Sequence, residues 1–438
     1  MLTRRDALRA ALLMAVAGSG LSALTGCGES AESGGGGAGI GLAASDVRRS
    51  PGNSDALPDV VAGVQAFTGD LYRLAAAGTR DNLVLSPYSV AVALAMTRAG
   101  AAGRTASEMD SVLHAPPGDR LHGGMNELSA RLESRSRSHE LPEGGKAEVA
   151  LSVASSLWGQ HDLAWEQEFL DTLAREYGAG MRLVDYVADA ERARELVNEW
   201  TAEHTRDKIT ELVPEGVFDA LTRLALVNAI HFKAPWLEPF EDERNGARFT
   251  LGDGEQVEVD LVTQLLMQAE YAEGSGWVAA RMPYVGGELA MALVVPEDLG
   301  AVEEGLDAAW LGELLGGFAR AEGGVRVTMP RWDFRSRLSV REALSELGMP
   351  TAFDPEAADF TKMTPDERLH ISHVLHEATI TVDEKGTEAA AATAVVMGVT
   401  SAPVEPPREV TADRPFLFVV HDVATATPLF IGRVADPR

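Results

Sequence analysis

Apolar residues recur at spacings of three and four through most of the first half of the chain. In residues 58–77 this pattern includes Val60, Val64, Phe67 and Leu71, and it predicts an amphipathic helix. Another helix is expected after Ser86, because Pro87 suits a first helical turn. The same periodicity predicts helices over 105–113, 121–137, 166–176 and 189–205.

Short apolar or alternating runs predict strands, most of them in the second half of the chain. They cover 83–85, 148–158, 223–232, 278–282, 289–295, 325–329, 369–382 and 416–433. Strands and helices do not alternate regularly, so the expected class is α+β. No internal repeat and no linker interrupts residues 57–438, which are therefore interpreted as one large domain.

The first 26 residues have the pattern of an export signal. Thr3-Arg4-Arg5 is followed by an apolar stretch over 10–24, too short for a comfortable membrane span. The paired arginines resemble a twin-arginine signal. Leu24-Thr25-Gly26-Cys27 resembles a bacterial lipobox, in which the cysteine carries the lipid and becomes the mature N-terminus. A cysteine placed there by chance is the alternative.

Residues 27–56 are expected to be a flexible tether. Gly, Ser and Ala dominate 30–41, and such a segment buries too little apolar area to offset the entropy lost on ordering. Cys27 is the single cysteine of the 438-residue chain, so no intrachain disulfide can form.

The net charge of -28 argues against two classes of partner. Nucleic acids and anionic membranes both attract Lys and Arg, and this chain has an excess of Asp and Glu. The excess is interpreted as a solvated surface. Membrane contact is expected only through a lipid on Cys27.

No enzyme motif is found. Gly-x-Ser-x-Gly and His-Glu-x-x-His are both absent from the sequence. His370, His373 and His376 are spaced by three, but they fall on an expected strand. His373 would then point away from the other two, which would lie about 20 Å apart. We therefore expect no metal, no cofactor and no catalytic activity.

Residues 382–401 combine a strand, a charged Glu-Lys-Gly turn and a run of small residues. The alanines favour a helix by propensity. However, from Thr387 onward one parity holds only small or apolar side chains, while the other holds the only charge, Glu388. Such a segment could enter a sheet with Thr387 facing a core and Glu388 facing water.

This segment resembles the proximal hinge of the reactive-centre loop in inhibitory serpins. The hinge residues identified by the resemblance are Glu384, Gly386, Thr387, Ala389, Ala391 and Thr393. Five other segments are similar to serpin signatures in the same order along the chain. They are 86–89, 226–229, 232–236, 413–418 and 428–434.

The resemblance implies a serpin fold, with three β-sheets, eight or nine helices and an exposed reactive-centre loop. It also implies inhibition of a serine-type protease by a suicide-substrate mechanism. The protease forms an acyl-enzyme with the loop, and the cleaved loop then inserts into the central sheet and traps it. The small hinge residues favour an inhibitor, since insertion must not bury charge. A non-inhibitory serpin acting as a binding or chaperone module is the alternative.

The resemblance also assigns residues to two regions that control opening of the sheet. Ser86, Ser89, Asn228 and His376 are placed in the shutter, where the central strands part. Trp236 is placed in the breach at the top of the sheet. Arg331 matches a basic position facing the hinge, so an ion pair with Glu384 is expected; a solvent-exposed arginine is the alternative.

The reactive bond depends on the direction of counting. Counting from Gly386 gives Thr400-Ser401, whereas counting back from Pro415 gives Val404-Glu405. We prefer Thr400-Ser401, because the extra loop length fits between 403 and 408. A small residue there suits elastase-like or subtilisin-like proteases, and a cysteine protease is a further candidate. The protein is expected to be a monomer outside the cell or on its surface.

Overall fold

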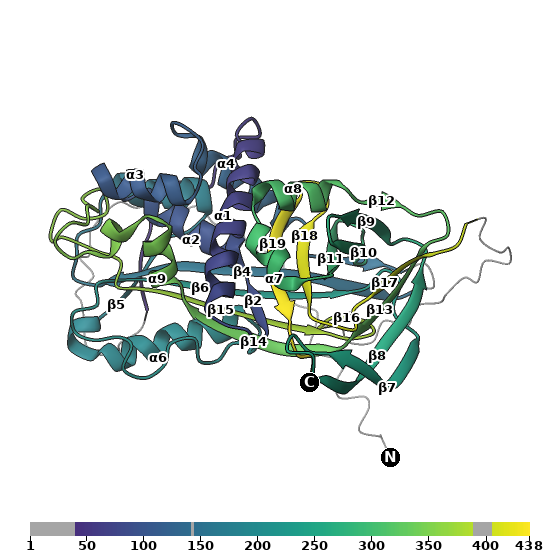
Figure 1. The fold of residues 1–438 in the computed structure, drawn as a ribbon. Helices are drawn as coiled ribbons and strands as arrows, with labels where there is room; N and C mark the ends of the chain where they lie inside the picture. The colour runs from purple at the N-terminus through teal and green to yellow at the C-terminus, as the bar shows by residue number, and fades with distance from the viewer. Residues whose placement is uncertain (1–39, 142–143, 389–404) are drawn as a thin grey trace, which may run out of the picture. The chain divides into compact units, whose positions relative to one another are not determined.

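The computed structural model describes residues 40–141, 144–388 and 405–438, which belong to one compact unit. Within these ranges the chain forms the three sheets and nine α-helices that the resemblance implied (Figure 1). The helices are α1 (Leu57–Ala77), α2 (Pro87–Arg98), α3 (Gly103–Val112), α4 (Arg120–Glu133), α5 (Gln167–Thr172), α6 (Tyr186–His204), α7 (Leu299–Gly305), α8 (Ala308–Gly316) and α9 (Val340–Leu347). None of these helices is long and apolar enough to cross a membrane.

Sheet A is the central sheet. Its strand order is β1 (Gly41–Ala43), β5 (Met181–Val184), β4 (Lys146–Gln160), β6 (Leu224–Pro235), β16 (Gly386–Thr387), β15 (His373–Val382) and β14 (Trp332–Ser339), with β3 (Arg137–Glu140) paired to β4. β4 and β6 are antiparallel, whereas β6 and β15 are parallel.

Two further sheets complete the fold. Sheet B has the order β12 (Ala319–Arg320), β9 (Glu270–Gly274), β10 (Trp277–Pro283), β11 (Leu289–Pro296), β18 (Phe416–Asp422), β19 (Thr427–Val434) and β2 (Leu83–Leu85). Sheet C has the order β17 (Arg408–Thr411), β13 (Val325–Pro330), β8 (Gln256–Leu266) and β7 (Asp242–Thr250).

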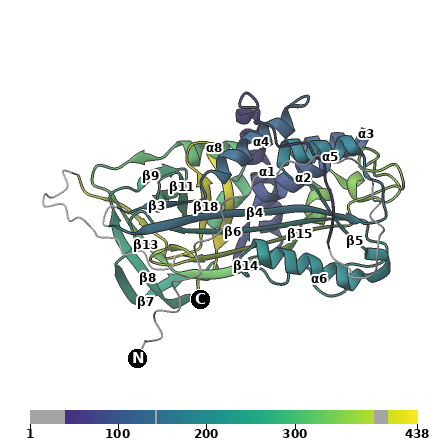
Figure 2. The ribbon, with the colours of Figure 1, turned by 180° about the vertical axis from the view of Figure 1, so that it is seen from behind.

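Sheet A is covered on both faces. Helices α1 to α4 lie on one side of it and α6 lies on the other (Figures 1 and 2). Along β6 the side chains alternate between these two faces. Leu226, Ile230 and Phe232 join the main core, whereas Val227 and Ala229 pack in a second cluster with residues of α6. Even-numbered positions of β6 therefore face the main core, and odd-numbered positions face the α6 side.

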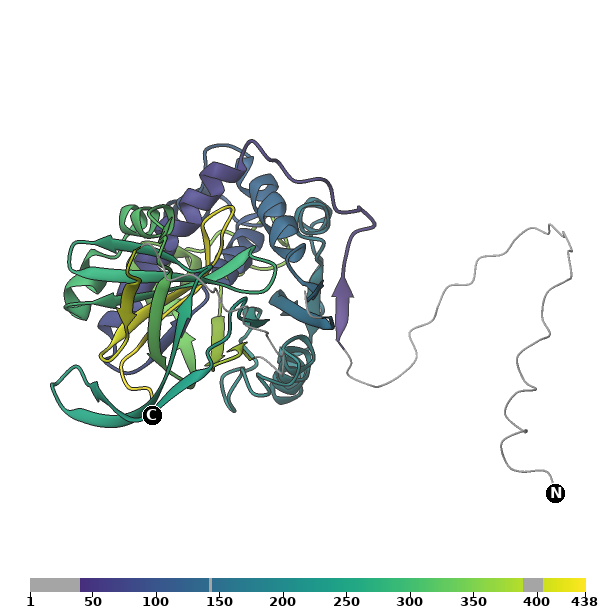
Figure 3. The ribbon, with the colours of Figure 1, turned by 90° about the vertical axis from the view of Figure 1, so that its right-hand side faces the viewer.

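Part of the expected tether is folded. Residues 41–43 form β1, which pairs with β5 at the edge of sheet A (Figure 3). Arg49 donates hydrogen bonds from Nε to Asn126 Oδ1 (2.8 Å) and from Nη1 to Glu133 Oε1 (2.9 Å) on α4. The prediction of a tether through residue 56 is therefore wrong for 40–56, because polar contacts and one edge strand hold this segment without a large apolar face.

Two predicted strands have different limits. The strand expected over 369–382 begins at His373, and the run over 416–433 is a hairpin of β18 and β19. Buried Leu369 and Ile371 lie in coil before β15, and a partly exposed turn over 423–426 separates β18 from β19, so apolar residues alone did not mark the ends of the strands.

Candidate functional site

A turn fixed by Asp383 leads from β15 into β16. Asp383 Oδ1 accepts hydrogen bonds from the amides of Lys385 (2.7 Å) and Gly386 (3.0 Å). Gly386 has a φ of +154°, and a Cβ at this position would lie 2.3 Å from the carbonyl oxygen of Ala234. Only glycine can therefore bring the backbone this close to β6.

The two residues of β16 lie inside sheet A. Gly386 pairs with Pro235 and Thr387 with Ala234 on β6, while Val382 of β15 pairs with Thr387 on the other side. β6 and β15 pair directly only up to Ile230 and Ala378. Beyond that point the strands part, and the segment after the turn occupies the space between them.

Thr387 faces the core of the molecule. It is 1% exposed, and its hydroxyl lies 2.7 Å from the hydroxyl of Tyr284. The ring of Tyr284 stacks on Trp236 at 4.5 Å with an interplanar angle of 9°. Burial raises the pKa of Tyr284, so the phenol stays protonated and can bond the threonine. The inward orientation expected for Thr387 is confirmed.

A buried hydrogen-bond network joins β6 and β15 where they still pair. His376 Nδ1 lies 2.7 Å from Asn228 Oδ1, and the Ser86 amide donates to His376 Nε2 (3.1 Å). Nε2 is therefore the acceptor, and Nδ1 carries the proton that bonds Asn228. Ser89 Oγ also donates to Asn228 Oδ1 (2.7 Å). Burial lowers the pKa of His376 to about 4, so the imidazole is neutral.

The network extends to β4 through a residue that the sequence did not indicate. Asn228 Nδ2 donates to Ser155 Oγ on β4 (2.8 Å), and Ser155 Oγ donates to the Ser89 carbonyl (3.1 Å). No spacing or motif distinguishes Ser155 from its neighbours. Ser86 joins the network through its backbone amide. Its buried hydroxyl has no hydrogen-bond partner among the described residues.

Trp236 and Arg331 hold the turn between β15 and β16. Trp236 donates from its amide to the Lys385 carbonyl (2.8 Å) and from Nε1 to the Asp383 carbonyl (3.0 Å). Arg331 Nε donates to Glu384 Oε2 (2.8 Å), so the expected ion pair is present. Burial raises the pKa of Glu384, but its backbone hydrogen bond and Arg331 outweigh burial and hold the pKa below its usual value.

Comparisons with known proteins agree with this arrangement. The family model described as Serpin (serine protease inhibitor) matches residues 62–437. The chain belongs to the serpin family. Leukocyte elastase inhibitor A of Rattus norvegicus is 33% identical over 375 residues, which cover 84% of this chain and 96% of that protein. An uncharacterized serpin-like protein of Methanosarcina acetivorans is 30% identical over 383 residues, covering 87% of each chain.

A solved serpin structure has the same architecture. Serpin48, described as a highly specific serpin in the insect Tenebrio molitor, matches with a TM-score of 0.74 and 27% identity. The match covers 88% of this chain and 99% of that structure. The regions around β16, His376 and Trp236 described above are those that the resemblance assigned to the hinge, the shutter and the breach.

Glu388 does not face water, contrary to expectation. It lies on the opposite face of the hinge from Thr387, but its side chain is only 6% exposed. Its Oε2 is 2.8 Å from His231 Nε2 and 3.2 Å from Lys208 Nζ. The reason is that, next to Glu388, the segment that connects α6 to β6 and contains Lys208 covers the α6 side of sheet A. Neither His231 nor Lys208 was predicted as a partner of Glu388.

Several predicted site residues lie outside the described residues. They are Cys27, the hinge residues Ala389, Ala391 and Thr393, the preferred reactive bond Thr400-Ser401, and Val404 of the alternative bond Val404-Glu405.

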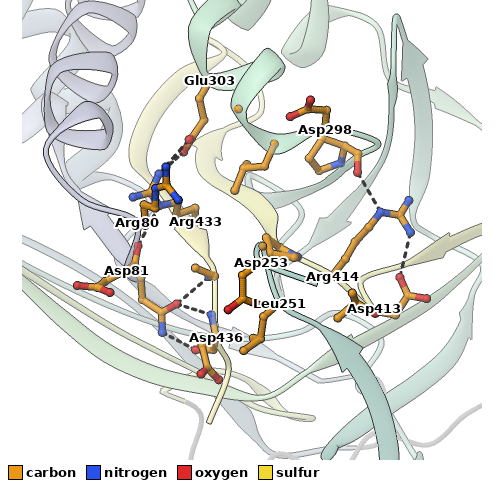
Figure 4. Close-up of a pocket in the computed structure, with 18 of the residues that line it drawn as sticks. Arg80, Asp81, Leu251, Asp253, Asp298, Glu303, Asp413, Arg414, Arg433 and Asp436 are labelled. Atoms are coloured by element: carbon orange, nitrogen blue, oxygen red, sulfur yellow. Dashed lines mark hydrogen bonds and ion pairs between the residues drawn. The ribbon is translucent and has the colours of Figure 1, made fainter. Parts of the chain in front are cut away.

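The described residues also enclose a large cleft of about 1280 Å³ between sheet B, sheet C and the chain terminus (Figure 4). Charged side chains line it, and two of its arginines, Arg433 and Arg414, are paired with neighbours. Arg433 Nη1 donates to Glu303 Oε2 (2.9 Å), while Arg414 donates to Asp413 Oδ1 (3.0 Å) and to the Pro296 carbonyl (3.0 Å). These contacts join the C-terminal strands to their surroundings, and the cleft is separate from the hinge.

Proposed function

We propose that this serpin inhibits a serine-type protease by acting as a suicide substrate, and that it is not itself an enzyme. The observation that supports this most directly is the position of Gly386 and Thr387 between β6 and β15. A sheet that already accepts the first residues of the loop can accept the following ones if the same two strands part further.

The chemistry belongs to the attacking protease. Its serine oxygen attacks the carbonyl carbon of Thr400, forming an ester, and the peptide bond to Ser401 breaks. The new amino group of Ser401 leaves with a proton from the protease. A strand from Thr387 to Thr400 would be about 46 Å long. Insertion of this strand would carry the attached protease along sheet A and distort its active site before the ester is hydrolysed.

The shutter would control how far the strands part. His376 on β15 and Asn228 on β6 are bonded across the boundary that must open. Ser89 and Ser155 hold Asn228 in place, so the opening would break the hydrogen bond between His376 and Asn228 and leave the bonds of Asn228 to the two serines with β6. A buried network of this kind stabilises the closed sheet as long as all its members are paired.

The sequence around Thr400 favours an elastase-like or subtilisin-like target. Val399 and Thr400 are small and uncharged, so they suit a shallow primary pocket rather than one that requires Arg or Lys. The rat relative is named as an inhibitor of leukocyte elastase.

We further propose that the protein is exported and anchored to the cell surface by a lipid on Cys27.

Incubation with a panel of serine and cysteine proteases tests this function. We expect a covalent complex with an elastase-like or subtilisin-like enzyme that survives boiling in detergent. Mass measurement of the released C-terminal peptide should place its first residue at Ser401; a start at Glu405 would support the alternative bond. Cleavage of the loop by every protease without any complex would instead identify a non-inhibitory serpin.

A further inference from the structure

The backbone turns sharply at Glu388, directly after the inserted residues. Glu388 has a φ of +49°, a left-handed conformation that is uncommon for residues other than glycine. Its amide donates to the Thr381 carbonyl (3.0 Å). The chain therefore cannot continue along β6 from this conformation, because a strand requires an extended residue at this position.

Two partners from different elements hold the Glu388 carboxylate in this turn. His231 lies on β6, and Lys208 lies in the connection between the end of α6 and the start of β6. Burial raises the pKa of Glu388, but the hydrogen bond and charge of His231 and the charge of Lys208 outweigh burial and lower it. The carboxylate is therefore ionised, and it links the hinge to the connection that covers this face of the sheet.

The strand register identifies a third basic residue. Thr387 pairs with Ala234 in an antiparallel ladder, so an extended residue 388 would stand opposite Lys233. Lys233 occupies an odd-numbered position of β6 and faces the α6 side, which is also the side of Glu388. Among the described residues the Lys233 side chain makes no hydrogen bond or ion pair, although its charge helps to lower the pKa of Glu148 on β4. Opposite charges directly across a ladder stabilise the pairing of two strands.

We propose that Glu388 sets the rate of loop insertion by exchanging one set of basic partners for another, and we call it an exchange latch. Lys208 and His231 hold it while Gly386 and Thr387 are inserted and residue 388 is turned, and Lys233 receives it when the strand extends through residue 388. Lys208 and Lys233 are thus positioning residues with opposite effects: Lys208 stabilises the state before insertion and Lys233 the state after it. This inference rests on the proposed function, and it explains how a charge is tolerated next to the first buried hinge residue.

The two lysines provide a matched pair of variants, Lys208→Met and Lys233→Met. Each removes one ammonium group that is partly exposed in the native protein. The intact proteins are incubated below their melting temperature, and conversion to a form whose loop resists proteolysis is followed with time. Lys208→Met should accelerate conversion roughly two- to fivefold, and Lys233→Met should slow it by a similar factor, as expected for partly exposed ion pairs.

Melting temperatures provide a second readout. Lys233→Met should melt like wild type when intact but at a lower temperature after loop cleavage by a non-target protease. Lys208→Met should lower only the melting temperature of the intact protein. In a Glu388→Gln background, which keeps an acceptor for His231 but removes the charge, neither lysine substitution should change the rate. Equal effects of the two lysines, or effects that persist without the carboxylate, would overturn the latch.

None of these measurements requires an inhibited protease. If wild type shows the opposite lysine effects but forms no covalent complex with any protease, the latch stands and the inhibitory function is wrong. If cleavage of the wild-type loop leaves the melting temperature unchanged, the loop does not insert and both proposals fail.

Discussion

Thr387 is the point at which the loop enters the core. Its hydroxyl reaches Tyr284, and Gly386 beside it has no room for a side chain. A larger or charged group at 387 would have to displace the stacked pair of Tyr284 and Trp236 or leave the sheet. Insertion of the hinge into sheet A therefore depends on one small side chain, Thr387, whose hydroxyl has a hydrogen-bond partner in the core.

We expect Thr387→Arg to convert the proposed inhibitor into a substrate. An unpaired guanidinium in this core would cost several kcal/mol, so insertion would be slower than hydrolysis of the acyl-enzyme. The protease should cleave the loop and regain full activity, as measured by residual activity and by gels run in detergent.

Thr387→Ser is the matched control, because it keeps the hydroxyl for Tyr284 and should inhibit like wild type. Glu388→Arg is unsuitable as a neutral control, because it would place a guanidinium beside Lys208 and His231. Inhibition by Thr387→Arg at the wild-type level would contradict this account of the hinge.

His376 is expected to make stability depend on pH. Its pKa is about 4 in the folded protein, because burial disfavours the charged form. The unfolded protein binds the proton below about pH 6.5, whereas the folded protein does not, so stability is complete above pH 6.5 and falls as the pH decreases toward 4. The loss from this residue would approach about 3 kcal/mol.

His376→Gln tests this expectation without the titratable group. The variant should be less stable than wild type at pH 7, by about 1–3 kcal/mol for the imperfectly paired Asn228. The difference should shrink between pH 7 and pH 5 in denaturant unfolding. His122 and His421 also have pKa values lowered to about 4 by burial, so a residual slope is expected. A variant with the same slope as wild type would exclude His376 as a contributor.

At the scale of elements, the sequence was most informative where a pattern was long. β4, β6 and β15 were predicted because each has a long run of apolar or alternating residues, and α1 and α6 because their periodicity spans several turns. β1, β3, β12 and β16 have two to four residues each and, unlike the equally short β2, contain no run of large apolar residues. These strands form because a neighbouring strand offers unpaired backbone groups. The pairing depends on that neighbouring strand as well, so the residues of the short strand alone do not reveal it.

The residues of the candidate site also fall into those that the sequence could identify and those that it could not. The hinge, His376, Asn228 and Arg331 could be placed from the sequence, because the family motifs contain them. Ser155, Tyr284, His231 and Lys208 could not, since each depends on which strand lies opposite. The Glu388 carboxylate was predicted to face water. That prediction failed because alternation indicates which face of a strand a residue lies on but not what covers that face.

The N-terminal segment should stabilise the protein through Arg49. Its guanidinium connects this segment to α4, and Asn126 is buried and would lose the donor to its side-chain oxygen. We expect Arg49→Ala to reduce the free energy of unfolding by about 1–2 kcal/mol. Arg48→Ala changes an exposed neighbour and should have no effect in the same urea titration. Equal stabilities of the two variants would mean that the segment contributes nothing through this contact.

At the scale of the whole molecule, the proposed anchor concerns where the inhibitor acts. A lipid on Cys27 would confine the folded unit to the outer surface of a membrane and would leave residues 28–39 as the connection. Replacement of this residue, Cys27→Ser, should release the protein from the membrane fraction or leave it unprocessed, as shown by cell fractionation and intact mass. Wild-type fractionation of the variant would be evidence against the lipobox.

The place of β18 and β19 in sheet B also bears on how the protein is made. These strands follow the hinge in the sequence, yet they lie between β11 and β2 in the sheet. A ribosome that has already translated the hinge has not yet produced the strands that close this sheet. Sheet B therefore cannot be completed before residue 434 has been translated, and a stop codon between the hinge and residue 416 would remove the partners of both β11 and β2.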